Sequence, residues 1–283
     1  MPELPELEAL VRTIGAAVCS SPVDAPPRAH FAVLKNAIPP LATLVGRTFD
    51  RAWRRGKHLL FDAGDATLAI HLMTMGRIGY YPPDQTKRPR GAVLEVAFAD
   101  GGALLATEGG TRKAMRVGLY EPAGVAALVG HLGPEPLPPS FDRAAFDAIL
   151  DREGRQLNAL LRDGRAIAGI GRAFADEILH EARLSPFQHS QRLDDAGRER
   201  LLIAIRAILE RGIATCLERQ GPVLPAKNDA RLLRIHHNDG KPCPRCGETL
   251  RFIDYEANRI VYCANCQTGG RILADRRMSR LLK

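Results

Sequence analysis

Four of the six cysteines form two pairs with the spacing of a metal site. The pairs are Cys243-x-x-Cys246 and Cys263-x-x-Cys266, with sixteen residues between them. This spacing is typical of tetrahedral zinc sites, in which each short turn directs two thiolates at one ion. Two disulfides are the alternative, but they suit an oxidising compartment, and the chain shows no secretory signal. The sequence therefore predicts one structural Zn²⁺.

The N-terminus offers a second reactive group. Met1 is followed by Pro2 and Glu3, and an initiator methionine before a small residue is normally removed. Pro2 would then carry a free secondary amine, and an α-amine with a pKa of about 8 is partly neutral and nucleophilic at physiological pH. Glu3 beside it could transfer protons as a general acid or base. The alternative is a helix start in which acidic residues face the helix dipole.

The charge of the chain favours an anionic partner. Its 283 residues have a net charge of +8, and +6 of this lies in residues 231–283. Such clustering is typical of nucleic-acid binding, although a solvated basic surface is the alternative. With 45% hydrophobic and 25% charged residues, the composition excludes a disordered or fibrous chain. No apolar run is long enough to span a bilayer, so we expect no membrane association. The N-terminus does not have the features of a signal peptide, so we expect a cytoplasmic protein.

Different periodicities divide the chain into regions. Apolar positions at helical spacing predict a helix over 3–18. Short apolar runs at 58–61, 67–73, 92–98, 103–107 and 115–120, separated by turn signals, predict a β-sandwich or barrel. The segment PEPLPP at 134–139 predicts a stiff linker. Beyond it, helices are predicted over 141–150, 156–161, 173–182 and 194–217.

Five segments together resemble the formamidopyrimidine-DNA glycosylase and endonuclease VIII family. They are MPELPE at 1–6, RRGK at 54–57, HLGPEPL at 131–137, GIGRAFADEIL at 169–179 and CANCQ at 263–267. The resemblance implies an α+β multidomain fold, in which an N-terminal β-sandwich flanked by helices precedes a helical helix-two-turn-helix domain with a C-terminal zinc finger. DNA would bind in the cleft between the domains. We expect a catalytic domain over 1–133, a linker over 134–140, the helical domain over 141–235, the zinc finger over 236–270 and a basic tail over 271–283.

The resemblance also assigns roles to individual residues. Pro2 would attack the sugar carbon C1′ and form a Schiff base, while Glu3 moves protons. Lys57 would contact a phosphate beside the lesion, with a solvated surface lysine as the alternative. His71 would face DNA, or it is only a half-buried strand histidine.

Several positions depart from the family pattern. A flipped base leaves a gap that an apolar side chain fills, and the family commonly has methionine where this chain has Thr74. Met73 and Met75 flank it, and on a strand both would face the same way; one of them is the predicted wedge, with core packing as the alternative.

Other departures concern phosphate contacts. In the loop at 107–116, which does not match the family pattern, Arg112 could meet a phosphate. Arg172 replaces the usual asparagine of a phosphate-binding helix start, and Arg259 lies one residue from the usual position of a phosphate-gripping arginine.

The leading hypothesis is a bifunctional DNA glycosylase and AP lyase that excises oxidised purines, such as formamidopyrimidines and 8-oxoguanine, from double-stranded DNA. Leu4 and the HLGPEPL segment favour the formamidopyrimidine branch. An endonuclease VIII-like enzyme for oxidised pyrimidines and a non-catalytic zinc-finger DNA-binding protein are the alternatives. The presence of Pro2, Glu3 and Lys57 argues against the non-catalytic protein, because a protein that only binds DNA needs no terminal amine. We expect a monomer.

Overall fold

The computed structural model describes residues 1–85, 87–225, 232–255 and 258–273, and the chain divides into two compact units. The first comprises Met1–Leu132 and Gly212–Lys227, and the second comprises Gly133–Arg211 and Asn228–Lys283. Residues 141–235, expected as one body, are therefore divided at Gly212. Within the described ranges, no helix combines the length and the apolar character needed to cross a membrane.

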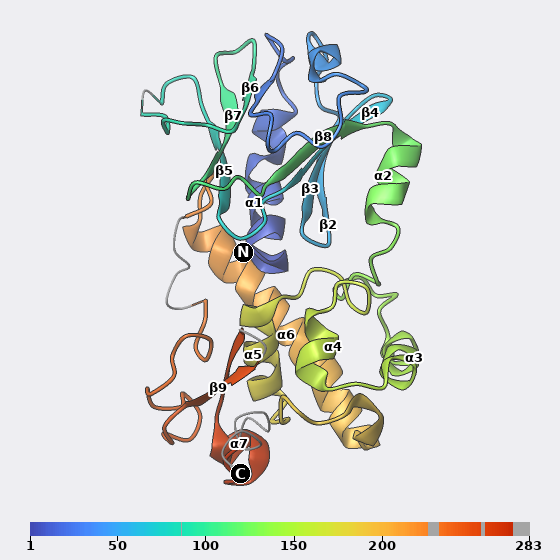
Figure 1. The fold of residues 1–283 in the computed structure, drawn as a ribbon, viewed down its shortest axis with the longest axis vertical. Coiled ribbons are helices and arrows are strands. Elements are labelled where there is room, and N and C mark those ends of the chain that lie inside the picture. Colours follow the sequence, from blue (N-terminus) through green and yellow to red (C-terminus); the bar gives the residue numbers. More distant parts are fainter. Residues whose placement is uncertain (86, 226–231, 256–257, 274–283) are drawn as a thin grey trace. The chain divides into compact units, whose positions relative to one another are not determined.

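Two four-stranded antiparallel sheets form the β-sandwich of the first unit (Figure 1). One sheet has the order β1-β6-β7-β5 and the other the order β2-β3-β4-β8. The strands are β1 (Arg28–Ala29), β2 (Arg51–Arg55), β3 (His58–Ala63), β4 (Ala66–His71), β5 (Gly76–Tyr81), β6 (Leu94–Ala97), β7 (Ala103–Glu108) and β8 (Arg116–Tyr120). The helical elements are α1 (Leu4–Val18), the 3-10 helix η1 (Leu41–Leu44) and α2 (Pro122–Val129).

Helix α1 is part of the core between these strands. Its apolar residues recur every three or four positions, and Leu7, Leu10 and Ile14 are buried in one cluster with residues from both sheets. The helix packs against β2 and β5. The predicted helix over 3–18 is thus confirmed, and packing of its apolar face fixes the start of the chain against the sandwich.

Strand β5 was not predicted, and its edge receives a distant segment. Tyr80 N donates to Pro222 O at 2.9 Å, and Leu224 N donates to Ile78 O at 3.0 Å. Gly79 permits this approach, since a Cβ there would lie 2.6 Å from Val223 Cγ2. This pairing attaches residues 222–224, within the Gly212–Lys227 stretch, to the first unit.

The second unit is mainly helical and carries a small cysteine-bearing subdomain. Its elements are α3 (Arg143–Glu153), α4 (Leu157–Arg162), α5 (Arg172–Glu181), η2 (Ser190–Arg192), α6 (Asp195–Arg219, which continues into the first unit), β9 (Arg251–Tyr255), β10 (Asn258–Tyr262) and α7 (Ala264–Thr268). The four predicted helices are confirmed with shifted ends. Strands β9 and β10 form an antiparallel hairpin.

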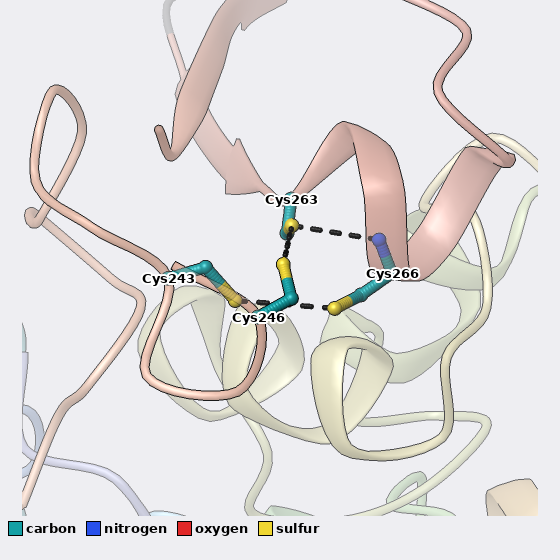
Figure 2. Close-up of side chains that lie close together, drawn as sticks. All are labelled: Cys243, Cys246, Cys263 and Cys266. Carbon is teal, nitrogen blue, oxygen red and sulfur yellow. Dashed lines mark hydrogen bonds between the residues drawn. The ribbon is translucent and has the colours of Figure 1, made fainter. Parts of the chain in front are cut away.

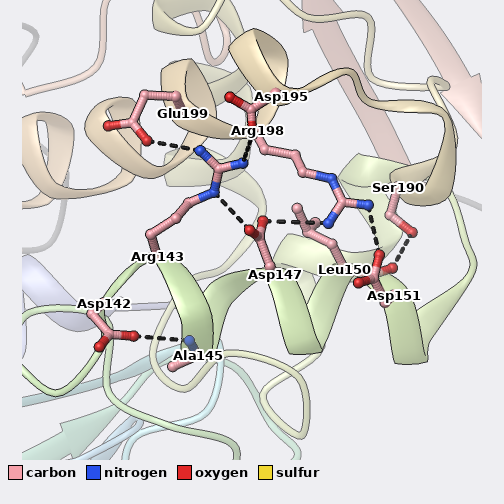
Figure 3. Close-up of polar contacts among 10 residues, drawn as sticks. All are labelled: Asp142, Arg143, Ala145, Asp147, Leu150, Asp151, Ser190, Asp195, Arg198 and Glu199. Carbon is pink, nitrogen blue, oxygen red and sulfur yellow. Dashed lines mark hydrogen bonds and ion pairs between the residues drawn. The ribbon is translucent and has the colours of Figure 1, made fainter.

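Charged side chains join α3 to the start of α6 (Figure 3). Arg143 bonds Asp147 at 2.8 Å and Glu199 at 3.0 Å. Arg198 bonds Asp147 at 3.3 Å and Asp151 at 2.6 Å. Asp147 thus accepts from both arginines, so the pairs form a network rather than isolated bridges. Individual exposed pairs contribute little, but a network of this kind fixes the register of one helix on the other.

Candidate functional site

The predicted nucleophile and its neighbour lie at the start of α1. Pro2 is buried, and Glu3, the N-cap residue, is 4% exposed. Glu3 N donates to a Glu6 carboxylate oxygen at 2.8 Å, one half of a capping box between these two residues. Pro5 in the first turn costs no helical hydrogen bond. The capping box therefore fixes the backbone of Glu3, next to the buried Pro2.

Glu6, in the first turn of α1, has a buried carboxyl group with a raised pKa. It is 5% exposed, and burial raises its pKa to about 7 against the opposing hydrogen bond from Glu3 N. The positive charge of Arg77 is close enough to lower it in part. Gln220 Nε2 donates to Glu6 O at 3.0 Å. Segments from both stretches of the first unit therefore surround the N-terminal site.

Lys57 lies in the two-residue turn of the β2–β3 hairpin, in which Arg55 pairs with His58. Gly56 supports this turn with φ +58°, a conformation that favours glycine. Arg54 is anchored below it by a 3.0 Å ion pair with Glu8, and its side chain is only 5% exposed. The anchor and the turn present Lys57, which is half-buried, at the end of the sheet.

Strand register places His71 in a row of basic residues. Arg55 pairs with His58, His58 with His71, and His71 with Arg116 across β2, β3, β4 and β8. The two imidazoles meet edge to face with centroids 4.8 Å apart. Sequence reasoning singled out only His71 in this row, because the other three positions become neighbours through the register.

Both imidazoles are neutral at physiological pH. Burial lowers the pKa of His58 to about 4, and burial, then His58, Lys57 and Arg116, lower the pKa of His71 to about 3. His71 Nδ1 accepts from Met73 N at 3.1 Å, which leaves the ring proton on Nε2. The row can therefore meet an anion with arginine charges and a neutral N–H donor. Lys57 and His71, both predicted DNA contacts, are brought together here.

The methionines predicted on a strand lie in a turn instead. The expected strand over 67–73 ends at His71, and 73–75 form a turn before β5. Gly76 N donates to Leu72 O at 3.0 Å, and a Cβ on Gly76 would lie 2.3 Å from that oxygen. The expectation that Met73 and Met75 share a strand face is therefore wrong. Met73 has φ +51°, whereas Met75 is 54% exposed and reaches the neighbourhood of Gly109.

The loop near Met75 carries Arg112. The Glu108 carboxylate accepts from the backbone of Ala114 at 2.9 Å and of Met115 at 3.1 Å. Lys113 Nζ donates to Glu108 O at 2.7 Å, so its charge helps to close the loop. Arg112 is exposed at its tip.

In the second unit, Arg172 is the first residue of α5 and is exposed. It follows a turn in which Gly169 has φ +88°. Two buried carboxylates fix α5 to the segment before the cysteines: Asp176 Oδ2 lies 2.7 Å from His236 Nδ1, and Glu177 Oε1 accepts from Ile235 N at 2.8 Å. These contacts attach α5, which Arg172 begins, to that segment.

Arg259 lies on the β9–β10 hairpin and forms ion pairs with two aspartates. It bonds Asp254 at 3.0 Å and Asp239 at 3.4 Å, and its guanidinium lies 3.9 Å from the Phe252 ring centroid. Arg172 and Arg259 both lower the pKa of His237, after its burial and His236. The two predicted phosphate contacts of this unit therefore lie around one histidine.

The four predicted metal ligands converge (Figure 2). Their sulfur atoms all lie within 4.8 Å of one another, with Cys243 and Cys266 3.9 Å apart and Cys246 and Cys263 3.5 Å apart. A tetrahedron with metal–sulfur bonds of about 2.3 Å has edges of about 3.8 Å. The spacing and the all-thiolate donor set therefore fit a four-coordinate metal ion. Burial raises the pKa of Cys263 to about 11, so metal binding would displace protons.

Comparison with known proteins gives consistent matches. Residues 1–115 match the formamidopyrimidine-DNA glycosylase N-terminal domain, and residues 132–219 match the formamidopyrimidine-DNA glycosylase H2TH domain. The formamidopyrimidine-DNA glycosylase of Moorella thermoacetica is 34% identical over 265 residues, covering 88% of this chain and 93% of that protein. A Lactococcus lactis Fpg (MutM) crystallised with DNA containing FAPY-dG has a TM-score of 0.81 and 26% identity, covering 94% of this chain and 100% of that one. A MutM bound to DNA containing carbocyclic 8-oxo-G gives the same TM-score and coverage at 25% identity.

Proposed function

This chain belongs to the formamidopyrimidine-DNA glycosylase family, and on that premise we propose that it is a base-excision repair enzyme. It excises oxidised purines from duplex DNA and cleaves the strand at the resulting abasic site. The observation that carries the proposal is the match of residues 1–115 to the family's N-terminal domain, beginning at the buried Pro2–Glu3 start of α1. The lesions in the DNA of the two similar complexes, 8-oxo-G and FAPY-dG, indicate the substrate class.

Pro2 acts as the nucleophile once Met1 is removed. Its neutral amine attacks C1′ of the damaged nucleotide, the bond to the base breaks, and the base departs with the bonding electrons. The nitrogen then loses its proton to Glu3, and its lone pair forms an iminium as the bond from C1′ to the ring oxygen breaks. The iminium is an electron sink for elimination of the phosphates. A lysine would need a strongly lowered pKa for the same task, whereas an α-amine is partly neutral without one.

Glu3 transfers the protons of this reaction. It adjoins the amine in sequence, and its backbone is fixed by the bond to Glu6. Protonation of the sugar ring oxygen by Glu3 opens the ring as the imine forms. Its fixed backbone limits the conformations that the carboxyl group samples, which favours a single proton-transfer geometry.

Phosphates position the DNA on both units. Lys57 and His71 bind one beside the lesion, supported by the surrounding arginines, while Arg112 binds another. Arg172 at the α5 start and Arg259 on the hairpin bind phosphates through charge-assisted hydrogen bonds. Arg259 must exchange an aspartate partner for the phosphate to do so.

Met75 fills the space left by the flipped base. Its side chain is 54% exposed at the tip of the 73–75 turn, as an intercalating group requires, whereas Met73 is partly buried. Zinc is the metal proposed for the four cysteines, since an all-thiolate tetrahedral site is its usual structural environment. It stabilises the small subdomain and takes no part in the chemistry.

Borohydride trapping tests the proposal. Reduction of the imine should give a stable protein–DNA crosslink on a duplex with one 8-oxoguanine. A variant with an N-terminal residue that cannot be trimmed should bind DNA yet form no crosslink, and Glu3→Gln should slow excision by about 10²–10⁴-fold. Undiminished crosslinking by the blocked protein would place the nucleophile on a lysine, Lys57 first. Faster excision of thymine glycol than of 8-oxoguanine would overturn the proposed substrate class.

A further inference from the structure

A histidine outside the four cysteines touches the cluster. His180, in the last turn of α5, is 5% exposed, and its Nε2 lies 3.2 Å from Cys243 Sγ. It does not join the group of four mutually close ligand atoms. His180 is therefore a neighbour of a ligand rather than a fifth ligand.

The chemistry of the contact fixes its direction. A metal-bound thiolate has no proton to donate, so the imidazole must donate from Nε2. Four thiolates bring four negative charges to a divalent cation, and a hydrogen bond to sulfur spreads part of this excess. Cys263 Sγ receives such a bond from the backbone, from Cys266 N at 3.5 Å. Cys243 receives its bond from a side chain of α5.

We propose that His180 is a positioning residue for the metal centre. Its Nε2–H hydrogen bond to Cys243 orients that thiolate, lowers its charge density and slows loss of the metal. The proposal rests on the metal site proposed above, and it makes helix α5, which begins at Arg172, part of the support of that site.

A second contact between the same segments gives an internal control. Arg245, within the Cys243–Cys246 turn, donates to His180 O at 2.7 Å and pairs with Glu181 at 3.0 Å. Both contacts connect the turn to the end of α5. Loss of Arg245 therefore removes attachment and leaves the N–H···S bond in place.

The test uses the full chain loaded with Zn²⁺ or with Co²⁺. In His180→Phe, which keeps an aromatic ring but no donor, the metal affinity measured by chelator competition should fall by about 10–100-fold. The thiolate-to-cobalt charge-transfer band should move to longer wavelength, because an unbonded thiolate is easier to oxidise. His180→Gln, which offers an N–H at a similar reach, should restore both properties. Arg245→Ala should leave the band at the wild-type position.

Three results would overturn the proposal. The first is a His180→Phe protein with wild-type affinity and spectrum, which would leave the metal site itself intact. The second is a His180→Gln protein that behaves like His180→Phe, because ring packing rather than the donor would then matter. The third is a wild-type protein that binds neither metal, a result that would also remove the proposed zinc site.

Discussion

Replacement of Glu6 by glutamine should stabilise the first unit at alkaline pH and have much less effect at acidic pH. Burial raises the pKa of Glu6 from 4.5 to about 7. The folded state therefore binds more protons than the unfolded state between these two values, and wild-type stability falls as the pH rises through this window. Glutamine has the same shape, can still accept from Glu3 N, and has no ionisation to suppress.

The magnitude follows from the shift. One pKa unit corresponds to about 1.36 kcal/mol, so the change from 4.5 to about 7 makes ionisation of Glu6 cost about 3 kcal/mol in the folded state. Most of that cost develops between pH 5 and pH 8. The stability difference between Glu6→Gln and wild type should therefore grow by about 2 to 3 kcal/mol over this interval.

The assay is denaturant unfolding at several pH values. Trp53, the single tryptophan, lies on β2 and reports on the first unit by fluorescence. The exposed Glu121 of the same unit gives the matched control, and Glu121→Gln should show no growing difference. A Glu6→Gln difference that stays constant from pH 5 to pH 8 would refute the reasoning, and direct NMR titration of the Glu6 carboxyl carbon would locate the error.

Three further predictions concern metal and DNA. Cys246→Ser should lose zinc and DNA affinity together, whereas Cys19→Ser should keep both. Zinc content after dialysis tests this prediction, and a metal-loaded Cys246→Ser protein would contradict it. Arg172→Ala and Lys57→Ala should each reduce the slope of log affinity against log salt by about one unit on every DNA sequence; an unchanged slope means that the side chain contacts no phosphate. Met75→Ala should slow single-turnover excision while leaving the salt slope unaltered, and an equal rate would argue against a wedge at this position.

The sequence predicted those features that a strong local pattern defines. The apolar periodicity of residues 3–18 is sufficient to define α1, and the cysteine spacing is sufficient to predict the cluster. Strand β5 lacked such a signal, because Gly79 replaces an apolar residue where segment 222–225 approaches. That approach joins residues far apart in the chain, and no local pattern encodes it.

The other differences between prediction and structure arise from turns, strand alignment and contacts between distant segments. The apolar run through Met73 resembles a continuing strand, but the hydrogen bond from Gly76 N to Leu72 O closes a turn there. The row from Arg55 to Arg116 depends on the alignment of four strands, and a slip of one residue would send each side chain to the opposite face. His180 lies 63 residues from Cys243 in the sequence, so its contact appears only when α5 and the cysteine turn are both in place.

The pairing of segment 222–225 with β5 has a consequence for synthesis on the ribosome. The first unit is discontinuous, and residues 133–211 are made before its last part emerges. At a synthesis rate of about 5–20 residues per second, the β5 edge stays without segment 222–225 for several seconds. An open strand edge is a template for pairing with other chains. A nascent chain stopped near Leu132 should therefore be prone to aggregation, and expression of the first unit alone would require the 212–227 segment to be joined to it.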